Sequence, residues 1–352
     1  MIYKAGLSPE EVKKNYKLKR IIKLASNENN WGLPLKVIIR LASVLRESHR
    51  YPDNSYSELK EKIAKRYGIS CNRVLLGNGS DEIIDILINR LTEPDDEIIF
   101  PTPSFQLYKI LVKNHRRKGV EIPLVDWQYD IKKFLKTVNK KTRLLILCNP
   151  NNPTGTAVYR SDLLYLLSNL PSHVKVIIDE AYADFTTSKD FCSGIELLDE
   201  FPNLIVTRTF SKFFCFAGMR LGYAFASEKI SKIYNFFKMP FSINRIAASA
   251  YILFEYQRYF DSLKLKILKE KERFYSKMQN MNVKFVKSET NFVFLPEIKN
   301  AKRVFEELLK KGIIVRELSN FGIKSGLRIT IGKPQENSLF FKEFKRVINH
   351  EG

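Results

Sequence analysis

Lys212 is the residue of this chain whose neighbours best fit covalent chemistry. It stands in the step Ser211-Lys212, shortly before Arg220. A lysine amine can form a Schiff base with a carbonyl compound and can later act as a general base. The competing interpretation is an ordinary surface lysine, so the assignment depends on the groups that the fold brings to Lys212.

An acid and a phenol precede that lysine in the sequence. Asp179 ends an apolar run and is followed three residues later by Tyr182. A carboxylate at the end of a buried strand is costly without a partner, and a protonated pyridine nitrogen would serve as one. Tyr182 and Asn152, the latter in the turn 149–155, could both bond a phenolic oxygen on such a ring. The alternatives are a backbone-satisfied acid and an ordinary β-turn.

Two segments could hold a phosphate group. Residues 77–82, Gly-Asn-Gly-Ser-Asp-Glu, open a predicted helix over 83–91, and the N-terminus of a helix offers free N–H groups to an anion. Plain capping by Ser80 or Asp81 would need no ligand. The second segment supplies two hydroxyl groups and a bidentate guanidinium, those of Thr209, Ser211 and Arg220. Together with Lys212, these groups could hold a phosphorylated pyridine aldehyde.

Three further residues are predicted to line the same site. Tyr108 is a candidate to stack on the pyridine face, whereas we expect Phe105 to pack in the core. Arg328 is a charge inside an apolar strand pattern and is predicted to bind a substrate carboxylate. Arg316, on the preceding strand, could hold a second anionic group. A structural salt bridge is the alternative for each arginine.

Short apolar segments that alternate with helical patterns must position these residues. The predicted strands are 73–76, 97–100, 144–148, 174–178, 204–207 and 221–226. Such alternation indicates a mostly parallel sheet with helices on both faces, and ligands bind such sheets at the carboxyl ends of the strands. Asn149, Asp179 and Thr209 each follow a strand, so we expect them to converge on one crevice.

The pattern changes after Pro240. A long helical stretch over 243–281 is followed by predicted strands, another helix and a last helix; the strands are 283–286, 291–295, 313–316 and 327–331, and the helix is 301–311. We therefore expect an α/β fold of two domains. The large domain spans 31–240, and a smaller α+β domain combines 1–30 with 241–352.

Composition narrows the functional class. The formal net charge is +21, but the lysines are spread along the chain without a nucleic-acid-binding motif, so we expect no nucleic-acid partner. A basic cleft for anionic substrates is the other interpretation of that charge. The four cysteines show no metal-ligand spacing, and no metal site is expected. Without a signal peptide or a membrane-spanning stretch, the expected location is the cytoplasm.

In this order the motifs resemble those of the fold-type I pyridoxal-phosphate enzymes, and within them the histidinol-phosphate aminotransferase family. The resemblance covers nearly the whole chain. Its motifs are Ile22–Asn29, Tyr51-Pro52-Asp53, Gly77–Glu82, Asn149–Gly155, Asp179–Tyr182, Ser211-Lys212, Thr290–Val293 and Leu327–Gly332.

The resemblance implies a pyridoxal 5'-phosphate site shared between the subunits of a homodimer. Lys212 is then the Schiff-base lysine, and Arg328, Arg316 and Asn27 bind substrate. The implied cofactor residues are Asp179, Tyr182, Asn152 and Tyr108 at the ring, Ser80, Asp81, Thr209, Ser211 and Arg220 at the phosphate, and Tyr51 from the neighbouring subunit. The implied reaction moves an amino group between glutamate and a small phosphorylated ketone, with imidazole-acetol phosphate first.

Three departures from the family pattern leave the amino acceptor open. They are Asn30-Trp31-Gly32 in place of Pro-Tyr-Gly, the bulky run Phe213–Phe216 after the lysine, and Ser242 in place of asparagine. Another small phosphorylated ketone is one alternative, and decarboxylation of a phosphorylated threonine or serine is another. The His-Gly-Gly-Asn signature of those decarboxylases is absent, which favours transfer. A transcriptional regulator on this fold would carry an added helix-turn-helix domain, which we do not expect here.

Overall fold

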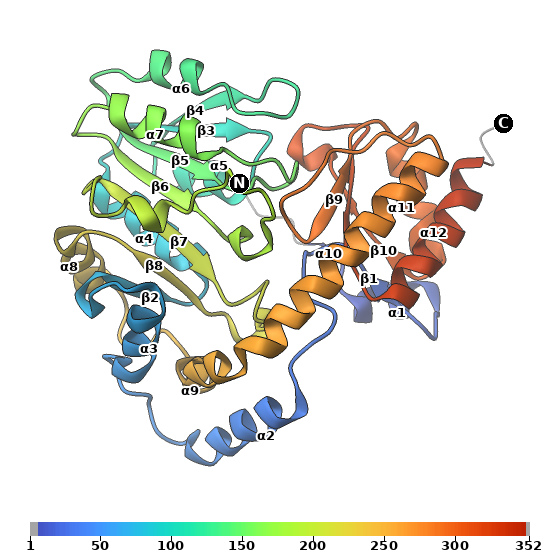
Figure 1. Ribbon diagram of the computed structural model, residues 1–352, viewed down its shortest axis with the longest axis horizontal. Coiled ribbons are helices and arrows are strands. Elements are labelled where there is room, and N and C mark those ends of the chain that lie inside the picture. The colour runs from blue at the N-terminus through green and yellow to red at the C-terminus, as the bar shows by residue number, and fades with distance from the viewer. Residues whose placement is uncertain (1–5, 350–352) are drawn as a thin grey trace.

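The computed structural model describes residues 6–349, and its larger part is built on a seven-stranded sheet of order β2-β8-β7-β6-β5-β3-β4 (Figure 1). The strands are β2 (Val74–Gly77), β3 (Glu97–Thr102), β4 (Lys118–Pro123), β5 (Thr142–Cys148), β6 (Lys175–Asp179), β7 (Leu204–Thr209) and β8 (Gly222–Phe225). Strands β3 to β7 are mutually parallel, and β8 is antiparallel to both β7 and β2. The ends of β5, β6 and β7 therefore meet at one edge of the sheet.

Helices cover both faces of this sheet. They are α3 (Ser57–Tyr67), α6 (Ile131–Thr137) and α7 (Arg160–Asn169) on one face, and α4 (Ser80–Leu91), α5 (Leu107–Asn114) and α8 (Glu228–Phe237) on the other. Strand β6 shows why both faces are apolar. Val176 and Ile178 belong to the first hydrophobic core, whereas Ile177 belongs to the second, because successive side chains of a strand point to opposite faces.

The C-terminal part carries a three-stranded antiparallel sheet of β11 (Arg316–Glu317), β12 (Leu327–Thr330) and β9 (Phe292–Leu295). Its helices are α10 (Gln257–Asn280), α11 (Ala301–Lys310) and α12 (Pro334–Asn349). The N-terminal segment lies against it: β1 (Ile22–Lys23), which follows α1 (Pro9–Tyr16), pairs in parallel with β10 (Ile313–Ile314). These contacts agree with the expected domains, whose boundaries at residues 31 and 240 stay a prediction.

Local structure differs from the expectation in four places. The single strand expected over 313–316 is divided into β10 and β11, which belong to different sheets. Strand β4 was not predicted, because it is a largely exposed edge strand with charged residues and lacks an apolar run. Residues 283–286 contribute only a single bridge, Val286 to Phe294, and not a strand. The helical stretch after Pro240 is interrupted, with α9 (Arg245–Ala248) and a 3₁₀ segment (Ser249–Tyr256) before α10. The remaining α-helix is α2 (Leu35–Val44). Within residues 6–349, no helix is both long and apolar enough to cross a bilayer.

Candidate active site

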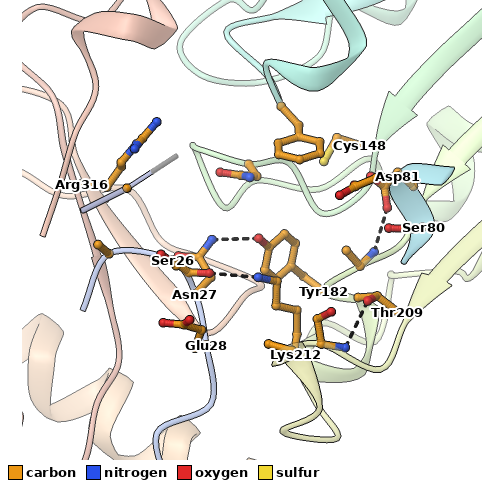
Figure 2. Close-up of a pocket in the computed structure, with 18 of the residues that line it drawn as sticks. Ser26, Asn27, Glu28, Ser80, Asp81, Cys148, Tyr182, Thr209, Lys212 and Arg316 are labelled. Carbon is orange, nitrogen blue, oxygen red and sulfur yellow. Dashed lines mark hydrogen bonds between the residues drawn. The ribbon is translucent and has the colours of Figure 1, made fainter. Parts of the chain in front are cut away.

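A cavity of about 340 Å³ lies at the carboxyl edge of the central sheet, between that sheet and the N-terminal segment (Figure 2). Nearly all of the predicted site residues line this cavity, although they are distant in sequence. Those that line it are Asn27, Ser80, Asp81, Asn152, Asp179, Tyr182, Thr209, Ser211, Lys212, Arg220, Arg316 and Arg328. Tyr108 and Tyr51 do not line it.

Lys212 projects into this cavity with its amine hydrogen-bonded to the protein backbone. Its Nζ donates to the carbonyl oxygen of Ser26 at 2.9 Å. Burial lowers the pKa of Lys212 to about 8, and the positive charge of Arg328 contributes to the decrease. A larger fraction of this amine is therefore neutral near physiological pH than for a lysine in water, and only the neutral form is nucleophilic.

Asp179 forms another wall and is held by three donors. Its Oδ2 accepts from the hydroxyl of Tyr108 at 2.6 Å, and its Oδ1 accepts from the backbone N–H of Ala181 at 3.2 Å and the hydroxyl of Thr207 at 3.3 Å. Burial nevertheless raises the pKa of Asp179 to about 6. A cation placed against this carboxylate would lower that pKa again, so the group suits a protonated ring nitrogen.

Tyr182 and Asn152 present polar groups between these two walls. The hydroxyl of Tyr182 accepts a hydrogen bond from Asn27 Nδ2 at 2.8 Å, and burial raises the pKa of Tyr182. The amide oxygen of Asn152 accepts from Arg328 Nη1. Among the described residues, the amide nitrogen of Asn152 has no hydrogen-bond acceptor, so it can donate to a ligand in the cavity.

The opposite end of the cavity is an anion site at the start of α4. The N-cap is Gly79, with a φ of +82° and no side-chain cap, so Ser80 and Asp81 lie inside the first turn and neither caps the helix. A Cβ on Gly222 would lie 2.2 Å from the backbone nitrogen of Ser80, so only glycine lets β8 approach this turn. Free first-turn amides attract anions.

Side chains from the loop after β7 complete that anion site. The guanidinium of Arg220 donates to the hydroxyl of Ser211 at 3.4 Å and to Asp81 Oδ2 at 3.3 Å. The hydroxyl of Thr209 accepts from the backbone N–H of Ser211 at 3.1 Å. Two hydroxyls, a guanidinium and helix amides make a donor set that suits a phosphate monoester.

Of the two aromatic residues near the start of α5, Phe105 lines the cavity and Tyr108 does not. Tyr108 is fully buried behind Asp179, because it belongs to α5, which packs on the sheet. Phe105 precedes α5 in the loop at the sheet edge and lines the cavity, edge-on to Tyr108 at 5.6 Å between ring centroids. Phe105 also packs against the second hydrophobic core, as expected. Tyr108 does not line the cavity, so the expectation that it faces a ring bound there is wrong.

The remaining points concern Tyr51 and three residues that line the cavity although the sequence did not single them out. Tyr51 is 77% exposed and stacks on Phe241 at 4.6 Å between ring centroids, so its expected role in a neighbouring subunit stays a prediction. The sequence did not single out the Ser26 carbonyl, Glu28 or Phe321, which also line the cavity. A backbone carbonyl carries no sequence signal, and Glu28 could have been found only from its place next to Asn27.

One cavity thus offers an amine, a buried carboxylate and a phosphate site, a set that fits pyridoxal 5'-phosphate. A family model described as aminotransferase class I and II matches residues 19–342, and the chain belongs to that family. It is a pyridoxal-phosphate-dependent aminotransferase.

Individual proteins with similar sequences indicate a narrower family within this class. The chain is 38% identical to histidinol-phosphate aminotransferase 2 of Carboxydothermus hydrogenoformans, over 98% of this chain and 96% of the relative, and it belongs to the histidinol-phosphate aminotransferase family. Two solved structures share the fold. The histidinol-phosphate aminotransferase of Sinorhizobium meliloti, in complex with pyridoxal-5'-phosphate, has a TM-score of 0.92 at 24% identity, covering 98% of this chain and 96% of that one. The Clostridium acetobutylicum enzyme of that name has a TM-score of 0.87 at 26% identity, covering 94% and 100%.

Proposed function

We propose that this enzyme moves an amino group between glutamate and a small phosphorylated ketone, with imidazole-acetol phosphate and histidinol phosphate as the substrate pair. The observation that carries the proposal is the pair Arg316 and Arg328. They are direct cross-strand partners of β11 and β12, and both line the cavity that contains Lys212. Cross-strand partners lie on one face of a sheet, so two guanidinium groups serve one anion site.

This arginine pair is separate from the phosphate site at α4, which belongs to the cofactor. A substrate with a phosphate group, or glutamate with its carboxylates, would place an anion at Arg316 and Arg328 and its amine near Lys212. Bidentate guanidinium contacts fix both the position and the orientation of such groups. Substrates without an anionic group at that distance would bind poorly.

Each polar group then has a distinct task. Asp179 would hold the protonated ring nitrogen, and Tyr182 and Asn152 would hold the ring oxygen. The first turn of α4, with Thr209, Ser211 and Arg220, would hold the phosphate. When bound, pyridoxal 5'-phosphate supplies an electron sink. Lys212 would hold the cofactor, and its amine would accept and return the proton at the substrate Cα.

A homodimer with shared sites is part of the proposal. Large apolar side chains of α2 and the segment after it are exposed, among them Leu35, Ile39 and Leu45. Several large exposed apolar side chains on one short segment are typical of an interface. Tyr51 follows the same segment and would reach the cofactor phosphate of the neighbouring subunit. The four free cysteines agree with a reducing compartment, the cytoplasm.

Half-reactions on the purified holoenzyme test the function. Histidinol phosphate should convert the absorbance of the bound cofactor to that of its amine form, and 2-oxoglutarate should restore it. Phosphothreonine is the comparison, with released CO₂ measured. Release of CO₂ from phosphothreonine, without a response to histidinol phosphate, would show a decarboxylase instead. A response to other phosphorylated amines alone would retain transfer and change the acceptor.

The assignment of Lys212 as the lysine that holds the cofactor is tested separately by borohydride reduction, which links the cofactor irreversibly to that lysine. The Lys212→Ala variant should retain no reduced cofactor, whereas Lys269→Ala, an exposed lysine on α10, should retain as much as the unmodified enzyme. Trapping that persists undiminished in Lys212→Ala rejects the assignment of the anchor.

A further inference from the structure

Asn27 is the feature of this site that the predicted function does not explain. Its side chain is buried, with 1% exposed, and its backbone has a φ of +56°. Asparagine tolerates this left-handed region better than most residues do. A substrate-binding role was expected for Asn27, yet its side chain is already bonded to residues far away in the sequence, Tyr182 and Thr330.

The hydrogen bonds around Thr330 determine which way the Asn27 amide faces. The backbone N–H of Asn27 donates to the hydroxyl oxygen of Thr330 at 2.9 Å, so that oxygen is an acceptor there. The Thr330 hydroxyl proton is therefore available to Asn27 Oδ1, 3.2 Å away. With the Thr330 hydroxyl donating to Oδ1, the amide oxygen of Asn27 faces Thr330 and its amide nitrogen faces Tyr182.

The orientation of that amide decides the direction of the phenol proton. Asn27 Nδ2 donates to the Tyr182 hydroxyl at 2.8 Å. Because the Tyr182 oxygen accepts this bond, its own proton must point elsewhere. Within residues 6–349 the Tyr182 hydroxyl makes no other hydrogen bond, and its side chain lines the cavity. The proton is thus presented to the cavity.

The same two-residue segment also holds the lysine. The carbonyl oxygen of Ser26, directly before Asn27, accepts from Lys212 Nζ (Figure 2). The backbone carbonyl of Asn27 accepts from Asn291 Nδ2 at 3.0 Å, which ties the segment to the strand region before β9. Two adjacent residues, Ser26 and Asn27, therefore position both the amine of Lys212 and the hydroxyl of Tyr182.

We propose that Asn27 is a positioning residue, held by Thr330, that makes the Tyr182 hydroxyl a hydrogen-bond donor to the ring oxygen of the cofactor. The inference rests on the proposed placement of the cofactor ring but not on the identity of the substrate. A donor to the ring oxygen stabilises its anionic form, so it lowers the pKa at which the bound chromophore gains a proton. Loss of that donor raises this pKa.

The Asn27→Asp variant reverses the direction of the hydrogen bond between residue 27 and Tyr182, while the side chain keeps almost the same shape. A carboxylate only accepts, so it takes the Tyr182 proton away from the cavity, and aspartate tolerates the same backbone conformation. In a spectrophotometric pH titration of the holoenzyme without substrate, the midpoint of the cofactor band should rise by about one pH unit, a tenfold change in proton affinity. The affinity of the apoprotein for pyridoxal 5'-phosphate, measured by fluorescence quenching, should fall.

Thr330→Val tests the same set of hydrogen bonds at a second residue, and Thr330→Ser is its matched control. This pair decides the question if Asn27→Asp does not fold. Valine cannot donate to Asn27 Oδ1, which frees the amide to turn over, so the midpoint should rise. Serine keeps the hydroxyl and should retain the original midpoint. If the midpoints of Asn27→Asp and Thr330→Val stay within about 0.2 units of the original, well below the tenfold change, the proposal is overturned. A failed half-reaction with histidinol phosphate would not affect this result.

Discussion

Lys212 and Ser26, 186 positions apart in the sequence, are joined by a 2.9 Å hydrogen bond from the lysine amine to the backbone carbonyl. The bond gives the amine an acceptor inside the cavity that does not depend on a ligand. It also means that the N-terminal segment, which pairs with β10, directly completes a site built on the central sheet.

In the apoprotein, Lys212 should be acylated by acetic anhydride with a half-maximal rate near pH 8, because burial lowers the pKa of its amine to about 8. Quantitative mass spectrometry of each lysine peptide gives the profile, with the other lysines as internal references. Removal of the nearby positive charge by Arg328→Gln should raise the pKa of Lys212 and move the profile to higher pH. A profile that does not move would contradict the electrostatic role of Arg328.

The lowered pKa of Lys212 also has a consequence for stability, whose sign follows from linkage. Protonation of this amine is less favourable in the folded state, so the destabilisation is fully present below about pH 8 and disappears toward the unfolded value of 10.5. The apoprotein of Lys212→Met should therefore melt at a higher temperature than the original at pH 7, by a few degrees. The difference should shrink as the pH approaches 10; a constant difference would indicate a packing effect.

Tyr108→Phe should weaken cofactor binding by about tenfold, since a hydrogen bond to a charged group contributes about 1.5–3 kcal/mol. The variant removes a donor to Asp179, so the pKa of this carboxyl rises above about 6 and more of it is neutral at pH 7. Equilibrium dialysis at pH 6.5 and 8.5 should show the larger loss at the lower pH. Tyr129→Phe is the matched control, because that hydroxyl donates to the carbonyl of Cys148 instead. Equal losses in the two variants would argue against a role through Asp179.

Gly222→Ala should destabilise the protein by about 1–3 kcal/mol, the usual cost of overpacking, and should weaken cofactor binding. The added Cβ would lie 2.2 Å from the backbone nitrogen of Ser80 and would displace the first turn of α4. Gly218→Ala is the control in the same cavity, because a Cβ there meets nothing within 4 Å. Denaturant unfolding and cofactor titration of both variants provide the comparison, and similar behaviour of the two would contradict the close approach of β8 to α4.

Shared sites predict complementation between two inactive variants, Tyr51→Ala and Lys212→Ala. In a mixed dimer, one site combines Lys212 of the first subunit with Tyr51 of the second, and the other site lacks both. Random reassociation of equal amounts should therefore restore about a quarter of the original activity, as two-fold symmetry requires. Activity no greater than that of the separate variants would show that the sites are not shared in this way.

The sequence predicted the central sheet well, because its strands are buried on both faces and read as continuous apolar runs. Strands β3, β5, β7 and β8 overlap the expected segments with ends that differ by one or two residues, and β2 and β6 are each shifted by one residue. The edge strand β4 was missed, since one exposed edge removes the apolar signal. The interruption before α10 was also missed, because the 3₁₀ segment Ser249–Tyr256 contains no glycine or proline that would mark a break in the helix.

The types of chemistry followed from the sequence alone. A lysine, an acid and a phenol after successive strands, with a glycine-rich helix start, specify groups that a parallel sheet must bring to one edge. Which side chain then faces the cavity depends on the rotation of a helix and the path of a loop, and so only the tertiary structure places Phe105 there instead of Tyr108. It alone also shows that Ser26 holds the amine of Lys212 and that Asn27 directs the proton of Tyr182, because backbone carbonyls and the orientation of an amide leave no trace in a sequence.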